Sequence, residues 1–285
     1  MHSLALSYEG CEIPADVMDL VDVLEVSPET IAHGDGGRLD REHVACLREL
    51  NAHTPFTIHG ISLSIGSADA WNDAYLRLLD QCFDAFPNIL WHSDHLGFTR
   101  VDGVELCTLL PLPYTHESLD LVSLRIERLI RRYEHPFLIE PVVNLLPVPP
   151  GDMTEAAYLN VLTSRTACRL LLDAYNLVCD VRNHGRDIEA FLNEVDLRYM
   201  RELHIAGGVA VDGIQLDVHT AVPDPQTLAV ANQILEQRPN DVLVTFELFR
   251  EGYELIGSLL GDEVRTIRDW LATVPCDARS ISAVA

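Results

Sequence analysis

The sequence predicts an α/β fold of the (β/α)8 TIM-barrel class, and three observations lead to this. The chain has 285 residues, close to the roughly 250 residues of such barrels. Short apolar segments alternate with longer segments of helical periodicity, as parallel strands joined by helices require. Polar residues follow several apolar segments, which is where barrels carry their sites. We expect one barrel domain over residues 1–274 and a C-terminal tail over 275–285.

Eight apolar segments are short enough to be strands. They cover residues 3–8, 20–26, 56–60, 89–93, 136–141, 168–174, 201–206 and 241–248. Segments with apolar residues at helical spacing separate most of them. Helices are expected over residues 39–52, 67–83, 118–133, 153–166, 187–195, 225–237 and 261–273. Ser67 is the predicted N-cap of the second helix.

Two connections between predicted elements have informative sequences. The sequence NHG at 183–185 predicts a turn. The connection over residues 207–224 is long for a barrel. Because long loops in compact domains tend to be functional, we expect the second connection to contribute to a site.

The charge of the chain limits its partners. The formal net charge is −24, from 44 acidic against 20 basic residues. Phosphates repel such a chain, so neither nucleic acid nor an anionic membrane is an expected partner. Every basic residue is an arginine, and the absence of lysine excludes lysine Schiff-base chemistry and a P-loop. No apolar run reaches the roughly 18 residues of a membrane span.

Cysteine usage predicts a reducing compartment. The chain has seven scattered cysteines without a CxxC motif, at Cys11, Cys46, Cys82, Cys107, Cys168, Cys179 and Cys276. An odd, dispersed set is typical of free thiols. The start of the chain lacks the basic region and long apolar stretch of a signal peptide. We therefore expect a cytoplasmic protein.

A histidine or an acidic residue ends each of six consecutive predicted strands. They are His59, His95, Glu140, Asp173, His204 and Glu247. The C-terminal ends of barrel strands converge on one mouth, so all six are expected to face a common centre. Carboxylates and imidazoles buried together stay unsatisfied unless a cation binds them. We therefore predict a polynuclear metal site.

Three further residues are placed to reach the same centre. Asp217 and His219 lie two apart in the long loop, so in an extended segment both point the same way and can bind one ion. Asn176 follows Asp173 by three residues, one turn past the strand. Each residue taken alone is as readily a structural hydrogen-bonding group. The combined register of the whole set is what favours ligands.

The remaining polar candidates have other expected roles. Glu25, Asn183 and His184 are candidates for contacting the substrate or orienting a ligand, with a salt bridge or a turn as the alternative. The other histidines lie off the pattern, and we expect them at the surface. They are His2, His33, His43, His53, His92, His116 and His135.

The types of ligand indicate the metal. Histidines and carboxylates without cysteine suit Fe, Mn or Zn and not an iron–sulfur cluster. Eight or nine ligands correspond to two or three ions, because each ion takes only about four to six. Glu140 is placed to bridge two of them. A serine-nucleophile elbow, GxSxG, does not occur in the sequence.

At these motifs the chain resembles the multinuclear non-heme iron-dependent oxidase family. The similarity covers about residues 3–250 and rests on HGISLSIGS, SDHLGF, LLLDAYNLVCDVRNHG, ELHIAGG and DVHTAVPD, in family order and spacing. The xylose-isomerase-like barrels share the architecture but not this series of motifs.

The resemblance implies a barrel that holds two or three irons and uses O2 as co-substrate. Characterised relatives oxidise peptides, often at cysteines of ribosomally made precursors, and a separate partner protein commonly presents the peptide. Matching motifs assign one iron to His59, His95 and Glu140, a second to Glu140, Asp173, His204 and Glu247, and a third to Asn176, Asp217 and His219.

The chain departs from the family pattern at three positions near the expected substrate. Pro141 follows Glu140 where relatives often have Asn. Gly208 replaces the last histidine of the usual HxAGH, and Phe249 stands where an acid is common. A small amino-acid-derived substrate is therefore an alternative to a peptide.

We expect an iron-dependent, O2-using oxidase that modifies a peptide or a small amino-acid-derived substrate in natural-product biosynthesis. A second interpretation is a sugar isomerase or hydrolase that uses Zn or Mn on the same barrel and consumes no O2. A third is a non-catalytic peptide-binding module, which would bind a peptide without needing a metal.

Overall fold

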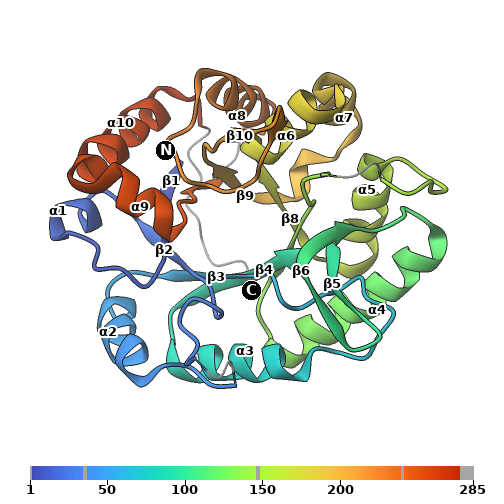
Figure 1. Cartoon of the computed structure of the whole chain (residues 1–285), viewed down its shortest axis with the longest axis horizontal. Helices are drawn as coiled ribbons and strands as arrows, with labels where there is room; N and C mark the ends of the chain where they lie inside the picture. The colour runs from blue at the N-terminus through green and yellow to red at the C-terminus, as the bar shows by residue number, and fades with distance from the viewer. Residues whose placement is uncertain (1, 35–36, 146–147, 239–240, 277–285) are drawn as a thin grey trace.

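The protein folds into a closed barrel of eight parallel strands surrounded by helices (Figure 1). The computed structural model describes residues 2–34, 37–145, 148–238 and 241–276. Neighbouring strands follow the order β1-β2-β3-β4-β7-β8-β9-β12, and β12 pairs with β1 to close the ring. The predicted (β/α)8 fold is confirmed. Of the predicted tail, residues 277–285 lie outside the described residues.

Each barrel strand is short and buried on both faces, since one face lies against the barrel interior and the other against the helices. Every residue of β2 and β3 is buried, for example. The barrel strands are β1 (Ser3–Tyr8), β2 (Val23–Val26), β3 (Phe56–Gly60), β4 (Ile89–His95), β7 (Phe137–Glu140), β8 (Arg169–Asp173), β9 (Met200–Ile205) and β12 (Leu243–Phe246).

Seven of the ten helices in the described part of the chain begin with a polar side chain that caps the first turn. Thr115 accepts a hydrogen bond from Ser118 N at 3.2 Å at the start of α4, and Asp224 caps α8. The helices are α1 (Ala15–Met18), α2 (Arg41–Asn51), α3 (Asp73–Ala85), α4 (His116–Tyr133), α5 (Glu155–Thr166), α6 (Ala174–His184), α7 (Ile188–Glu194), α8 (Pro225–Gln237), α9 (Arg250–Ile256) and α10 (Leu260–Thr273). Short 3-10 turns cover Leu197–Tyr199 and Gly257–Leu259. No helix in the described part of the chain is both long and apolar enough to cross a membrane.

One helix start was predicted wrongly, and α6 was not predicted. Ser67 caps no helix: its hydroxyl accepts a hydrogen bond from Asp69 N at 3.1 Å in a turn and donates to Arg100 O at 2.8 Å. Helix α3 begins at Asp73 with Asn72 as its cap. After β8 the chain enters α6 at once, and the helix predicted over 187–195 follows it as α7. The predicted turn at 183–185 is the end of α6, where Gly185 adopts φ +68° as its C-cap.

Two hairpins were not predicted. β5 (Gly97–Val101) pairs with β6 (Val104–Pro111) in the connection after β4. β10 (Ala210–Val211) pairs with β11 (Ile214–Gln215) in the long connection before α8. Both connections leave the C-terminal ends of their barrel strands, so they lie at the mouth of the barrel.

Two histidines expected at the surface are buried. His2 is 2% exposed and bonds to the backbone at the base of the barrel. His92 is 1% exposed because it points outward from β4 into an aromatic cluster that includes Phe83, Tyr133 and Phe137. The prediction missed His92 because outward-facing residues of a barrel strand lie beneath the helices and not in solvent.

Candidate metal centre

The six strand-end residues lie at the C-terminal ends of the barrel strands. All are buried except His95, which is partly exposed. The fold therefore brings together side chains that are far apart in the sequence. They come from β3 (His59), β4 (His95), β7 (Glu140), β8 (Asp173), β9 (His204) and the residue after β12 (Glu247).

Glu140 is the centre of a first group. Its Oε2 lies 3.4 Å from His59 Nε2 and 3.2 Å from His95 Nε2. This buried oxygen accepts no hydrogen bond from any described residue. His59 Nδ1 contacts Ser93 Oγ at 2.9 Å, and His95 Nδ1 contacts Gly60 O at 3.1 Å. The two Nδ1 contacts fix both rings so that Nε2 points at the Glu140 carboxylate. Proteins orient histidine ligands of metals in the same way.

His204 is the centre of a second group. The ring is fully buried, with Nδ1 2.8 Å from Glu247 Oε2 and Nε2 3.1 Å from Glu25 Oε2. Glu25, His204 and Glu247 offer ligand atoms within 4.8 Å of one another, and His204 does the same with His59 and Glu140. Glu25 therefore lies where it can orient His204 or bind an ion itself.

His219 is the centre of a third group. Its Nδ1 lies 2.8 Å from Glu247 Oε2, and its Nε2 lies 2.6 Å from Asp217 Oδ1 and 3.4 Å from Asp173 Oδ2. None of these contacts has hydrogen-bond geometry: in the described structure, both ring nitrogens and Asp173 Oδ2 are buried without a hydrogen bond. Imidazole nitrogens and carboxylate oxygens thus lie at ion-pair distances without forming hydrogen bonds, as ligands around an ion do.

Asn176 lies between the groups. Asp173 caps α6 by accepting a hydrogen bond from Asn176 N at 2.9 Å through Oδ1, which leaves Oδ2 for the cluster. The amide nitrogen of Asn176 faces Glu140 Oε1 at 3.4 Å. With the amide turned over, the nitrogen donates to both oxygens of Asp217, at 3.0 and 3.1 Å. Its amide oxygen can therefore be turned towards either carboxylate.

Burial shifts the pKa values of the carboxyl groups and imidazoles in the cluster. It raises the pKa of Glu140 well above its usual range and that of Asp173 to about 6. Burial, together with a neighbouring histidine, holds the pKa of His59 well below its usual range. Burial also acts to lower the pKa of His204, but two adjacent carboxylates outweigh it and the pKa rises. Divalent cations would remove this conflict by favouring ionised carboxylates and neutral imidazoles together.

A cavity of about 600 Å3 opens at the cluster. This is within the usual size range of small-molecule sites, roughly 300–1,000 Å3. Glu25, His59, Asn176 and Glu247 line part of it. Apolar side chains line much of the rest, namely Ile61, Leu109, Val143, Leu145, Leu216 and Phe249. The arrangement can hold an organic substrate directly beside the candidate ligands.

Glu202 and Glu9 were missed by the sequence reasoning. Glu202 is fully buried inside the barrel, where it accepts hydrogen bonds from Trp91 Nε1 at 2.8 Å and Thr245 Oγ1 at 2.6 Å. Its Oε1 lies 3.7 Å from His204 Nε2. Residues two apart in a strand face the same side, so the position of His204 already implied an inward Glu202. Glu9 lines the cavity, and burial raises its pKa to about 7.

Asn183 and His184 do not line the cavity. Asn183 bonds to the backbone of Gln215 in the long loop, at 2.8 and 2.9 Å. His184 is exposed, and its ring bonds to the carbonyl of Asn144. Among these candidates from the sequence, Glu25 alone lies at the cluster.

The three departures from the family pattern have distinct surroundings. Pro141 is buried directly after Glu140. Phe249 packs against His219, with ring centroids 4.9 Å apart, and lines the cavity. At Gly208 a Cβ would lie 2.5 Å from the hydroxyl oxygen of Tyr175, so the tyrosine fills the space a side chain would need.

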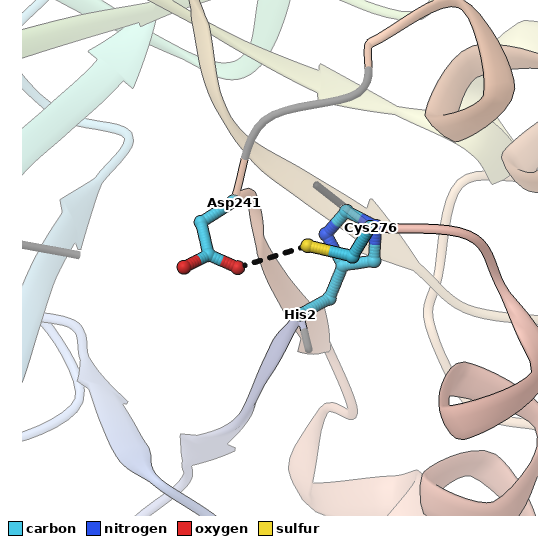
Figure 2. Close-up of side chains that lie close together, drawn as sticks. All are labelled: His2, Asp241 and Cys276. Atoms are coloured by element: carbon cyan, nitrogen blue, oxygen red, sulfur yellow. Dashed lines mark hydrogen bonds between the residues drawn. The ribbon is translucent and has the colours of Figure 1, made fainter. Parts of the chain in front are cut away.

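A second cluster of ligand-type residues lies at the opposite end of the barrel, where the strands begin (Figure 2). It comprises His2, Asp241 and Cys276, with Cys276 Sγ 3.1 Å from Asp241 Oδ1. Both nitrogens of His2 face the backbone: Nδ1 accepts from Val242 N at 3.2 Å, and Nε2 lies 3.3 Å from Pro275 O. These bonds use the lone pair of His2 that an ion would need. The cluster instead ties His2 and Cys276 to the residues just before β12.

The sequence comparisons decide the family. The profile described as "RiPP precursor modification enzyme MbnB/TglH/ChrH" matches residues 8–248. The chain belongs to this family. It is 34% identical over 217 residues to a UPF0276 protein of Rhizorhabdus wittichii, covering 76% of each chain. It is 31% identical over 250 residues to a UPF0276 protein of Shewanella loihica, covering 84% of this chain and 87% of the relative.

The fold of this member of the MbnB/TglH/ChrH family is similar to that of other (β/α)8 barrels. A D-psicose 3-epimerase from Clostridium cellulolyticum superposes with a TM-score of 0.60 at 12% identity, covering 96% of this chain and all of that one. Endonuclease IV from Thermus thermophilus superposes with a TM-score of 0.56 at 14% identity, covering 95% and 99%. At this identity the likeness establishes the (β/α)8 fold alone.

Proposed function

We propose that the chain is a multinuclear iron-dependent oxidase that uses O2 to modify a peptide. The observation that carries this proposal is a set of buried ligand atoms with no hydrogen bond from the described residues: Glu140 Oε2, Asp173 Oδ2 and both nitrogens of His219. Native proteins rarely leave buried polar atoms unbonded. Because these atoms come from β7, β8 and the long loop and lie within reach of other ligand-type side chains, they fit a centre of more than one cation.

The geometry supports the assignment of ligands. His59, His95 and Glu140 would hold one ion, because their ligand atoms lie within 3.4 Å of Glu140 Oε2. We assign a second position to Glu140, Asp173, His204 and Glu247, and a third to Asn176, Asp217 and His219. Glu140 and Glu247 stand between neighbouring groups, where carboxylates can bridge ions. When bound, the irons would supply O2 activation and accept electrons from the substrate.

The chain itself binds and orients the substrate. The cavity of about 600 Å3 has room for one residue of a peptide, and apolar side chains line much of its wall. The rest of the peptide would stay outside the barrel mouth. We therefore include a separate substrate-presenting partner protein in the proposal.

Family membership favours a ribosomally made precursor as the peptide. We propose a cysteine residue as the point of reaction, which the resemblance in sequence motifs implies. Pro141, Gly208 and Phe249 depart from the family pattern. We therefore keep a small amino-acid-derived substrate as the alternative to a peptide. All seven cysteines of the chain itself are unpaired. That state suits a reducing compartment, and we keep the cytoplasm as the proposed location.

Oxygen uptake tests the proposal. The protein loaded anaerobically with Fe(II) would be mixed with O2 and cysteine-containing peptides, alongside free amino acids as small substrates. We expect O2 consumption in step with substrate loss, and none in the Glu140→Ala variant. Glu155→Ala is a matched control, because Glu155 is a carboxylate bonded to Tyr114 and Arg186 and not part of the cluster.

Other outcomes separate the alternatives. Turnover of a sugar with Zn or Mn and without O2 uptake would favour an isomerase or hydrolase. Peptide binding that is unchanged by metal removal, without turnover, would favour a binding module. Full O2-dependent activity in Glu140→Ala would overturn the ligand assignment.

A further inference from the structure

Gln215 ties the long loop between β9 and α8 to helix α6. Its backbone nitrogen donates to Asn183 Oδ1 at 2.8 Å, and its carbonyl accepts from Asn183 Nδ2 at 2.9 Å. Its side-chain oxygen accepts from Arg182 Nη1 at 3.1 Å, and its side-chain nitrogen donates to the Tyr175 hydroxyl at 2.6 Å. All four polar groups of this buried residue are thus bonded to α6.

Tyr175 makes a second tie to the same loop. Its hydroxyl donates to Leu216 O at 3.1 Å, and its side chain is 1% exposed. Gly208 makes this contact possible, since a Cβ there would lie 2.5 Å from the hydroxyl oxygen and 3.1 Å from Leu216 O. We call the contacts of Tyr175 and Asn183 with Gln215 and Leu216 the α6 latch.

The α6 latch lies next to candidate metal ligands in both segments. In the helix, Tyr175 stands between Asp173 and Asn176. In the loop, Asp217 follows Leu216 directly, and His219 comes two residues later. One helix therefore carries ligands at its start and holds the loop that supplies the remaining ones.

The loop needs such support, because its backbone is strained at the ligand. His219 has φ +38°, a left-handed conformation that non-glycine residues adopt at a cost. On the far side, His219 O accepts a hydrogen bond from Phe249 N at 2.9 Å. The segment from Asp217 to His219 is thus held between the α6 latch and the chain after β12.

We propose that Asn183 and Tyr175 are positioning residues that hold Asp217 and His219 in place to bind one ion of the centre. The proposal rests on the proposed metal centre and deepens it. Loss of residues that support a ligand typically weakens metal binding by about 10- to 100-fold. Breaking the latch should therefore weaken the binding of one ion and leave the ion at His59, His95 and Glu140 unaffected.

The test compares Asn183→Ala and Tyr175→Phe with the wild-type chain. Asn160→Ala is the matched control: Asn160 makes the same two-sided bond to backbone, to Glu194 O at 2.8 Å and Asp196 N at 2.7 Å, away from the cluster. Anaerobic Fe(II) titration against a competing chelator measures each binding step. Hydrogen exchange of the metal-free proteins measures protection of the amides over residues 214–219.

We expect faster exchange at 214–219 and one Fe(II) bound about 10- to 100-fold more weakly in both latch variants, with Asn160→Ala like wild type. Unchanged exchange would overturn the latch. Faster exchange with unchanged Fe(II) affinity would overturn its role in positioning ligands. If the wild-type chain binds no iron, the proposed function fails, and the exchange data alone then decide whether the latch holds the loop.

Discussion

His92 gives a prediction whose size follows directly from its surroundings. Its ring centroid lies 5.4 Å from that of Phe83, 5.3 Å from Tyr133 and 4.9 Å from Phe137. Neither ring nitrogen has a hydrogen-bond partner among the described residues. Burial lowers the pKa of His92 from 6.5 to about 3. We predict that His92→Phe stabilises the protein, and more so as the pH falls.

The sign follows from proton uptake. The unfolded chain binds a proton at this position below pH 6.5, whereas the folded chain does so only below about pH 3. The stability that depends on neutral His92 is therefore complete above pH 6.5 and is lost as the pH falls towards 3. Each pKa unit corresponds to about 1.4 kcal/mol, so the loss at about pH 5 is about 2 kcal/mol.

Urea unfolding of the metal-free proteins at about pH 7.5 and about pH 5, followed by circular dichroism, measures the effect. The free energy of unfolding of His92→Phe should exceed that of wild type by about 2 kcal/mol more at the lower pH. His53→Phe, at an exposed position, controls for the loss of one histidine. An equal difference between His92→Phe and wild type at both pH values would refute the reasoning.

Three further predictions follow from packing and from metal binding. Gly208→Ala should lower the free energy of unfolding, measured with urea, by about 1–3 kcal/mol, because the added Cβ would clash with the Tyr175 hydroxyl. Adding Tyr175→Phe should restore part of this free energy. A double variant no more stable than Gly208→Ala would contradict the clash. Trp91→Phe leaves Glu202 Oε2 without its donor and should cost about 1–3 kcal/mol, so an unchanged melting temperature would contradict that bond. Removing metal from the iron-loaded protein with a chelator should lower the melting temperature in calorimetry, because the proposed ions would bind only the folded chain. Equal melting with and without chelator would contradict this.

The barrel and the strand-end residues were predictable because their signals are local and repeated. Each of the six strand-end residues ends an apolar segment, and closing the barrel brings those ends together. The two hairpins were also encoded. Asp102-Gly103 and Asp212-Gly213 occupy their turns with φ of 51°, 76°, 51° and 84°, and an Asp-Gly pair between strand-like residues is a strong hairpin signal. The start of α6 was likewise marked by Asp173, a favourable capping residue.

The remaining features depend on tertiary contacts that no local pattern contains. The sequence shows Asn183 in the NHG motif but not that it bonds to Gln215, thirty-two residues away. His92 alternates with inward-facing residues of β4, yet its aromatic surroundings come from α3, α4 and β7. Whether Glu25 is a ligand or a support for His204 depends on the distance between its carboxylate and the His204 ring, which the sequence does not contain.

The metal content of the protein tests the central claim most directly. The protein would be purified anaerobically from iron-supplemented cells, and elemental analysis would be combined with Mössbauer spectroscopy. We predict two to three irons per chain, with loss of iron in Glu140→Ala and retention in Glu155→Ala. Stoichiometric zinc or manganese with only trace iron would contradict the iron oxidase and favour an isomerase or hydrolase.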